Sequence, residues 1–245
     1  MQNSYALTFD IDWAPDFCID YIADILIAHK LKCTFFITHA SPALERLKKY
    51  PELFELGIHP NFLKGSSHGE THEEVMKHMM QLLPNCKVVR THALYQSATL
   101  FHLMRSQFGI EIDLSIFLNK HPNIKSNRIY YDHGDLSILH LPYFWEDDHE
   151  MYDPKQSWDI MDKTYQVPGL KIFNFHPVYV YINASEMHAY NKLKQKGYLA
   201  ELPQSLFDEV RQNDKKGAGS FFIQICEFLS TEKIETHTAS ELARL

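Results

Sequence analysis

Short apolar or aromatic runs alternate with longer stretches of helical periodicity along almost the whole chain. This alternation constrains the fold more than any other feature, because it is typical of repeated βα units that build a largely parallel sheet. The helical stretches include a proline at the first helical position, in Ser41-Pro42, and an apolar face formed by Val75, Met79 and Leu82. We predict an α/β fold whose strands occupy residues 5–12, 33–38, 55–59, 87–90, 109–114, 136–141 and 171–176.

The size and composition of the chain are those of an ordinary globular protein. With 245 residues, 45% of them hydrophobic and 22% charged, the sequence predicts a single domain over residues 1–245. The formal net charge of −7 disfavours nucleic acids and anionic membranes as partners, since there is no basic excess to neutralise phosphates. No run approaches the roughly 18 consecutive apolar residues that a transmembrane helix needs.

The cellular location is inferred from the first residues and from the cysteines. The first predicted strand begins at about residue 5, which leaves no room for a cleavable secretion signal. The four cysteines are scattered and none forms a C-x-x-C pair, so we expect them to be reduced. Both observations predict a cytoplasmic protein.

Titratable side chains stand where the predicted strands end. The first strand ends in Asp10-Ile11-Asp12, and side-chain alternation places both carboxylates on one face of a regular strand. Such a pair needs a cation or hydrogen bonds to compensate its repulsion, or else a position exposed to solvent. Other predicted strands end in or beside His59, Arg90 with His92, Asp113 and His176. In a parallel barrel these ends share one rim, which is where barrel enzymes carry their chemistry.

Several segments in succession resemble the motifs of a known enzyme family. They are Thr8-Phe9-Asp10-Ile11-Asp12, Cys33-Thr34-Phe35-Phe36-Ile37, Glu55-Leu56-Gly57-Ile58-His59, Arg90, Phe175-His176-Pro177 and the closing segment Phe228 to Leu242. Together they resemble the polysaccharide deacetylase family (NodB homology, carbohydrate esterase family 4). The resemblance implies a distorted, incomplete (β/α) barrel of about seven parallel strands, with long loops over the C-terminal rim.

The resemblance also implies a divalent metal ion. We expect Zn²⁺, with Co²⁺, Ni²⁺ or Mn²⁺ as alternatives, bound by Asp12 and His59. Asp10 is then expected to be the catalytic base. The two aspartates could exchange these roles, because Ile11 separates a pair that is adjacent in the family.

The remaining catalytic roles also follow from the resemblance. His176 is expected to be the general acid that protonates the leaving group. Arg90 is expected to keep Asp10 ionised, since an opposite charge favours the charged form of a carboxyl group. Asp113 is a further catalytic candidate, which either joins this network or caps a nearby loop.

The third metal ligand departs from the family pattern. The family's second histidine normally follows the first by four residues, where this chain has Leu63. Asn61, His68 and His72 are the nearby alternatives. We favour His68, because imidazole suits zinc better than an amide does and glycines on both sides of His68 allow a turn. The segment His59-Pro60-Asn61-Phe62 resembles a divergent bacterial branch of the family associated with O-antigen and surface-polysaccharide gene clusters.

Aromatic and acidic residues between 143 and 149 indicate a sugar-binding surface, although an exposed acidic turn would have the same composition. Aromatic rings stack on the apolar face of a sugar, and carboxylates bind its hydroxyl groups. We expect substrate contacts from Trp145, Glu146, His92 and Tyr95.

The predicted function is therefore a metal-dependent hydrolase that removes an N- or O-acetyl group from a saccharide. Because the chain is expected to be cytoplasmic, the substrate would be a precursor sugar of a surface polysaccharide. The alternatives are hydrolysis of another C–N bond, in a formamide or cyclic amide, and an inactive carbohydrate-binding relative.

Overall fold

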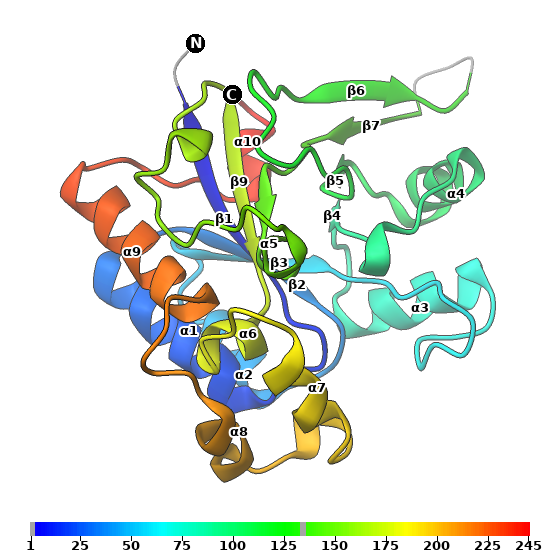
Figure 1. Ribbon diagram of the computed structural model, residues 1–245. Coiled ribbons are helices and arrows are strands. Elements are labelled where there is room, and N and C mark those ends of the chain that lie inside the picture. Colours follow the sequence, from blue (N-terminus) through cyan, green and yellow to red (C-terminus); the bar gives the residue numbers. More distant parts are fainter. Residues whose placement is uncertain (1–2, 133–135) are drawn as a thin grey trace.

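The sheet is curled into a half-barrel, as the computed structural model of residues 3–132 and 136–245 shows (Figure 1). Within these residues it contains nine strands in the order β6-β7-β5-β4-β3-β2-β1-β9-β8. Neighbouring strands are parallel, except that β6 runs antiparallel to β7. The strands are β1 (Ser4–Asp10), β2 (Cys33–Ile37), β3 (Phe54–Ile58), β4 (Val88–Val89), β5 (Ile112–Asp113), β6 (Asn127–Tyr130), β7 (Ser137–His140), β8 (Trp145–Glu146) and β9 (Leu170–Phe175).

The predicted α/β fold with a mostly parallel sheet is confirmed, whereas the predicted count of about seven strands is not confirmed, because the sheet has nine strands in the described residues. Each of the seven predicted strands is present, in several cases shorter than expected. The two additional strands are β6 and β8. All four residues of β6 are exposed, so the strand has no apolar periodicity, and β8 has only two residues before a helix begins.

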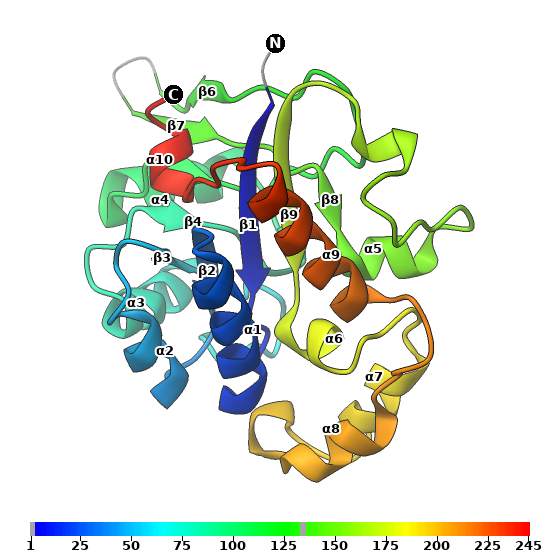
Figure 2. The ribbon, with the colours of Figure 1, turned by 90° about the vertical axis from the view of Figure 1, so that its left-hand side faces the viewer.

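Helices α1, α2 and α9 cover one face of the sheet, with α1 and α9 lying across β1 and β9 (Figure 2). Helices α6, α7 and α8 lie beyond the C-terminal ends of β1 and β9, at the bottom of Figure 1. Several helices are N-capped by a side chain. At the start of α4, for example, the hydroxyl of Ser97 accepts a hydrogen bond from the Leu100 N–H group. The helices are α1 (Asp16–His29), α2 (Pro42–Leu47), α3 (His72–Leu82), α4 (Ala98–Phe108), α5 (Asp147–Tyr152), α6 (Pro177–Tyr181), α7 (His188–Lys194), α8 (Gln204–Val210), α9 (Ala218–Thr231) and α10 (Ala239–Leu242), with short 3₁₀ turns η1 (His92–Leu94), η2 (Lys163–Tyr165) and η3 (Leu199–Glu201).

An aromatic cluster fills the space between the central strands and the covering helices. Phe9 of β1 stacks on Phe35 and Phe175 of the two neighbouring strands, with ring centroids 5.4 and 5.6 Å apart. Phe222 of α9 meets the same ring edge-on at 5.3 Å. Because these four side chains are fully buried, they hold the C-terminal end of β1 in place.

The opposite, concave face of the sheet changes from apolar to polar along β1. Ala6 belongs to an apolar cluster that Ala239 and Leu242 of α10 complete near the N-terminal ends of the strands. Two residues later Thr8 is buried among hydrogen-bonding partners, and β1 ends at Asp10. The polar side chains of the concave face are therefore concentrated at the C-terminal ends of the strands.

In the described part of the chain, no helix is long and apolar enough to cross a membrane. The four cysteines are buried, and none of them forms a disulfide bond in the structure.

Candidate active site

The first strand ends at Asp10, whereas the sequence predicted that it would continue to Asp12. The N–H group of Ile11 still donates to the carbonyl of Phe36, and the chain then turns, because Asp12 and Trp13 adopt φ values of +39° and +56°. Left-handed conformations cost a non-glycine residue roughly 1–2 kcal/mol each and are concentrated at functional sites. The turn brings the Asp12 carboxylate to the same side of the sheet as Asp10.

Asp12 lies within a compact group formed with two imidazoles. Its Oδ1 atom is 3.3 Å from Nε2 of His59 and 3.2 Å from Nδ1 of His92, and these two nitrogens are 3.3 Å apart. The other ring nitrogen of His59 lies 2.7 Å from the carbonyl oxygen of Arg90. A carbonyl oxygen can only accept, so Nδ1 carries the proton and the neutral ring presents a lone pair on Nε2.

These three residues fit a divalent metal ion. Asp12 Oδ1 is buried and makes no hydrogen bond, and a lone-pair nitrogen of His59 faces it. Burial by itself would raise the pKa of Asp12, but His59 and His92 hold it well below its usual value. Two imidazoles and one carboxylate are a donor set that zinc accepts with open positions for water or substrate.

The structure places His92, and not the expected His68, beside Asp12 and His59. Nδ1 of His68 accepts a hydrogen bond from the N–H group of Asn61, and its ring stacks on His78 at 5.1 Å. The ring of Trp13 is 5.5 Å from the rings of both His68 and His92. The pKa of His68 is lowered to about 4, mainly by burial and secondly by the nearby His78, so this ring is neutral at pH 7.

The remaining nearby candidates also lie outside this group. The side chain of Asn61 accepts a hydrogen bond from the N–H group of Leu63. His72 begins α3 and packs against Tyr95, with ring centroids 5.6 Å apart, and both rings contact Phe62. Tyr95, expected to contact the substrate, is therefore placed in a cluster of aromatic rings.

Asp10 is held by two side chains from other strands. Its Oδ1 accepts a hydrogen bond from Arg90 at 3.0 Å, and its Oδ2 accepts one from the amide of Asn174 at 2.8 Å. Burial would raise the pKa of Asp10, but Arg90 and then His59 outweigh this effect and lower it. Asp10 is therefore ionised at neutral pH. Asn174 was missed, although a polar residue within the apolar strand Leu170–Phe175 was a usable signal.

The guanidinium group of Arg90 is held by stacking and by hydrogen bonds from Nε and Nη1, whereas its buried Nη2 has no hydrogen-bond partner among the described residues. It is fully buried between the rings of Phe36 and Tyr143, with its central carbon 4.5 and 4.6 Å from the ring centroids. Its Nε atom donates to the carbonyl of Leu114 at 3.0 Å. An arginine held by stacking and hydrogen bonds in this way cannot be replaced by lysine without losing contacts.

His176 follows the last parallel strand and is oriented by Asp147. Its Nδ1 and its backbone N–H group lie 2.7 and 2.8 Å from the two oxygens of this carboxylate. Its Nε2 points into the cleft, 3.7 Å from Asp12. Burial would lower the pKa of His176, but Asp147 raises it well above its usual value. Asp147 was missed, although it lies in the acidic segment that was singled out.

Glu146 and Trp145, neighbours in β8, point in opposite directions. Glu146 faces the cleft and accepts hydrogen bonds from Asn174 at 2.9 Å and from the Tyr143 hydroxyl at 3.0 Å. Burial raises its pKa to about 8. Trp145 is fully buried, and its indole N–H group donates to Glu150 at 2.8 Å. Trp145 was expected to contact the substrate, but side-chain alternation in the strand directs its ring into the core.

Asp113 caps a loop, which was one of its two predicted roles. Its carboxylate accepts hydrogen bonds from the Ser115 hydroxyl and N–H groups at 2.6 and 3.1 Å. It also lies 2.8 Å from Nδ1 of the buried His140. None of these contacts links it to Asp10 or Arg90.

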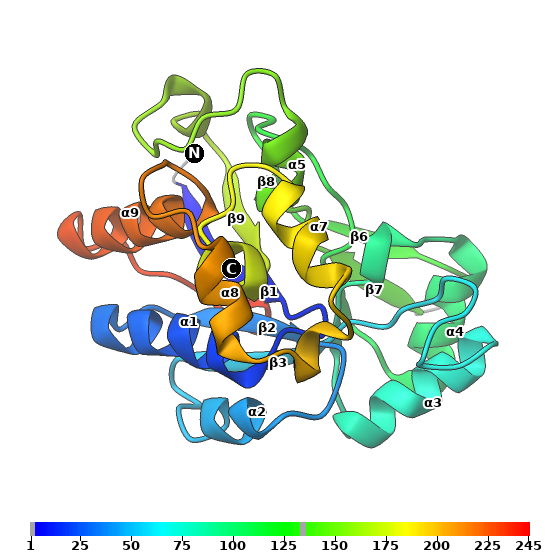
Figure 3. The ribbon, with the colours of Figure 1, turned by 60° about the horizontal axis from the view of Figure 1, so that its bottom comes forward.

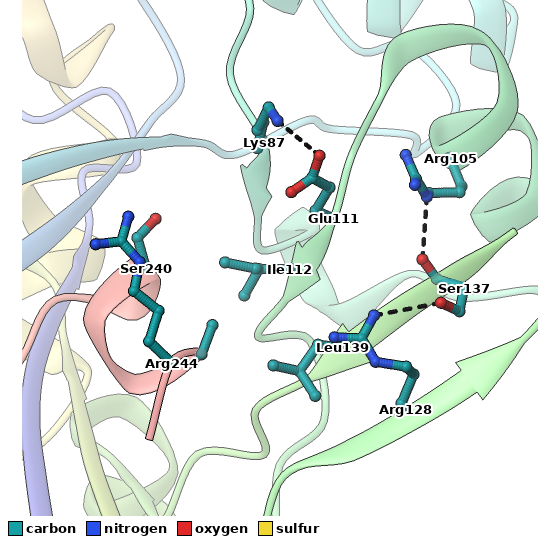
Figure 4. A pocket seen from close by; sticks show the side chains of 10 residues that line it. Lys87, Arg105, Glu111, Ile112, Arg128, Ser137, Leu139, Ser240 and Arg244 are labelled. Carbon is teal, nitrogen blue, oxygen red and sulfur yellow. Dashed lines mark hydrogen bonds and ion pairs between the residues drawn. The ribbon is translucent and has the colours of Figure 1, made fainter. Parts of the chain in front are cut away.

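A cavity of about 290 Å³ connects these groups at the C-terminal ends of the strands. It is lined by Asp10, Asp12, His59, Thr91, His92, Ala93, Leu94, Glu146, Asp148 and His176. Another cavity, of about 510 Å³, lies near the N-terminal ends of β4, β5 and β7 (Figure 4). None of its described lining residues is a histidine. The Lys87–Glu111 ion pair and the hydrogen bonds of Arg105 and Arg128 to Ser137 lie along its walls. The cavity with the carboxylates and imidazoles is the candidate active site.

The half-barrel with carboxylates and histidines at its strand ends agrees with the fold of polysaccharide deacetylases. The family described as WbmS-like polysaccharide deacetylase matches residues 7–194, and the chain belongs to this family. A search of curated proteins gave no match.

Solved structures agree with this assignment. One similar structure is a Bordetella bronchiseptica protein described as a polysaccharide deacetylase involved in O-antigen biosynthesis. It is 30% identical with a TM-score of 0.78, over 91% of this chain and 90% of that one. The peptidoglycan deacetylase PdaC from Bacillus subtilis shares the fold with 17% identity and a TM-score of 0.51, over 99% of this chain and 91% of that one.

Proposed function

We propose that the protein is a metal-dependent hydrolase that removes an acetyl group from a nitrogen or oxygen atom of a saccharide. One observation carries the proposal: two groups suited to proton transfer lie beside the group formed by Asp12, His59 and His92. Asp10 is 3.7 Å from His59, and His176 is 3.7 Å from Asp12. Membership of the WbmS-like deacetylase family supports the reaction type.

The proposed metal site consists of Asp12, His59 and His92. A divalent ion bound there, Zn²⁺ in the first place, would supply Lewis acidity toward an acyl carbonyl oxygen and toward water. Co²⁺, Ni²⁺ and Mn²⁺ are the alternatives for the same donor set.

Proton transfer is assigned to Asp10 and His176. Asp10 would accept the proton of the attacking water, because Arg90 keeps its carboxylate ionised and Asn174 fixes its orientation. His176 would donate a proton to the leaving amine or hydroxyl group, and Asp147 keeps its ring protonated and in place. Each such transfer is typically worth on the order of 10²–10⁴ in rate.

The proposed substrate is a precursor sugar of a surface polysaccharide, handled in the cytoplasm. The Bordetella relative, which is described as involved in O-antigen biosynthesis, supports this choice. Glu146 is the cleft residue best placed to bind a sugar hydroxyl. Its pKa of about 8 leaves the carboxyl group protonated at neutral pH, so it can both donate and accept a hydrogen bond.

The test is acetate release from N-acetylated and O-acetylated sugars, with and without a chelator, together with the metal content of the purified protein. We expect acetate release that the chelator abolishes and that added zinc or cobalt restores. Hydrolysis of formamides or cyclic amides by metal-free protein would contradict the proposal. Saccharide binding without any hydrolysis by the metal-loaded protein would contradict it as well.

A further inference from the structure

A second cavity opens beside the candidate active site and shares two of its residues. It has a volume of about 220 Å³ and is bordered by Asp12 and His92 on the side of the active site. Helix α7 and the turn after it form the other side, and Figure 3 shows this helix in front of the C-terminal ends of the strands. The remaining lining residues are Trp13, Tyr190, Lys194, Gly197, Tyr198 and Leu199.

Aromatic rings form much of this second cavity, and they are coupled to the active site. The ring of Trp13 meets His92 nearly edge-on at 5.5 Å. The ring of Tyr190 packs edge-on against Tyr179 at 4.7 Å, and Tyr179 contacts the His176 ring at 5.0 Å. Tyr198 lies at the mouth and is 50% exposed. Aromatic surfaces of this kind stack on the apolar face of a sugar ring.

One cation lines the same cavity without an acidic partner. Lys194 lies one helical turn after Tyr190, and its Nζ is 5.5 Å from the centroid of that ring. Among residues 3–132 and 136–245, Lys194 forms no ion pair or side-chain hydrogen bond. Of the carboxylates in the described part of the chain, only that of Asp12 lines the cavity, and it faces His59 and His92. The ammonium group is therefore available to an anion in a protein of net charge −7.

We propose that this cavity binds the phosphate-bearing part of the substrate. A sugar ring stacks between Trp13 and Tyr190, and its phosphate group accepts hydrogen bonds from Lys194. The acyl group then points toward Asp12 and His92. This inference rests on the proposed deacetylase function and specifies its substrate as a phosphorylated acyl sugar.

The test compares sugars that differ only in the phosphate. The probes are N-acetylglucosamine and N-acetylgalactosamine and their 1-phosphates. Binding to the metal-loaded protein is followed by tryptophan fluorescence, since Trp13 is the tryptophan that lines a cavity, while Trp145 and Trp158 are buried. We expect at least one 1-phosphate to bind more tightly than its neutral parent sugar.

The variant Lys194→Gln should weaken binding of that 1-phosphate on the order of tenfold, as expected for losing a charged hydrogen bond, and leave the neutral sugar unaffected. Lys192 is exposed like Lys194 and lies on the same helix, but it does not line this cavity, so Lys192→Gln should leave both affinities unchanged. Equal losses in the two variants, or equal affinities of phosphorylated and neutral sugars for the unmodified protein, would overturn the proposal. Binding that depends on Lys194 without any acetate release would instead refute the deacetylase function and leave this site in place.

Discussion

Replacing Asp147 by asparagine tests whether the orientation and charge of His176 matter for catalysis. Both carboxylate oxygens of Asp147 accept hydrogen bonds from His176, at 2.7 Å from the ring and 2.8 Å from the backbone. An asparagine has one oxygen, so its NH₂ group would face one of these two donors. A hydrogen bond to a charged group is worth about 1.5–3 kcal/mol, and an unsatisfied buried donor costs about 1–3 kcal/mol.

The stability and the turnover of the Asp147→Asn variant should fall by different amounts. Burial raises the pKa of Asp147 to about 6, so the carboxylate itself is costly to bury and its removal offsets part of the loss. We expect the free energy of unfolding to fall by about 1–2 kcal/mol. Turnover should fall on the order of 10²-fold or more, because His176 loses the carboxylate that keeps it protonated. The assay is acetate release at substrate saturation, with thermal unfolding and metal content measured on the same samples.

Asp113→Asn is the matched control. Asp113 is also fully buried and lies 2.8 Å from Nδ1 of a histidine, His140, but it does not line the active-site cavity. The control should lose comparable stability and keep its turnover. The reasoning fails if Asp147→Asn retains the turnover of the unmodified protein at equal metal content, or if both variants lose turnover equally.

Further predictions concern metal binding, a buried lysine and a buried arginine. His92→Ala should lower zinc affinity by at least about tenfold in a metal-binding titration, while His68→Ala should leave it unchanged; the reverse order would contradict the assignment. Lys171 is fully buried over the Phe144 ring, and burial lowers its pKa from 10.5 to about 8. The unfolded chain therefore binds more protons between these values, and the protein gains stability as the pH rises through this range. Lys171→Met should raise the free energy of unfolding by up to about 3 kcal/mol at pH 7, and denaturant unfolding should show this gain shrinking between pH 8 and pH 10.5. Arg90→Lys should destabilise by about 3 kcal/mol, because it removes the stacked cation that pairs with Asp10 and leaves Asn174 as the hydrogen-bonding partner of that carboxylate; denaturant unfolding would show this, and an unchanged midpoint would contradict it.

The order of the elements and the concentration of titratable side chains at one end of the sheet followed from the sequence. Apolar strand runs with titratable residues at their ends predicted a parallel sheet with one polar rim, and Asp10, Arg90 and His176 lie there. These predictions succeed because alternation within a strand and the common direction of parallel strands are local properties. The additional strands were missed, because an exposed four-residue strand and a two-residue strand leave no periodic signal.

Only the tertiary structure decided which second histidine lies beside Asp12 and His59. The sequence offers His68 in a glycine-rich turn and His92 after an arginine, and both positions are compatible with an approach to Asp12. The choice depends on the left-handed turn at Asp12 and Trp13 and on the stacking of His68 on His78. Such contacts join residues far apart in the chain, so no local pattern encodes them.

Contacts between distant residues also explain why the sequence did not predict the partners of the two proton-transfer groups, Asp10 and His176. Asn174 reaches Asp10 across 164 positions, and Asp147 reaches His176 across 29. The sequence alone indicated at which end of the sheet the titratable side chains that follow the strands lie. Only the folded chain decided which of them touch, because the curl of the sheet and the chirality of its loops set those distances.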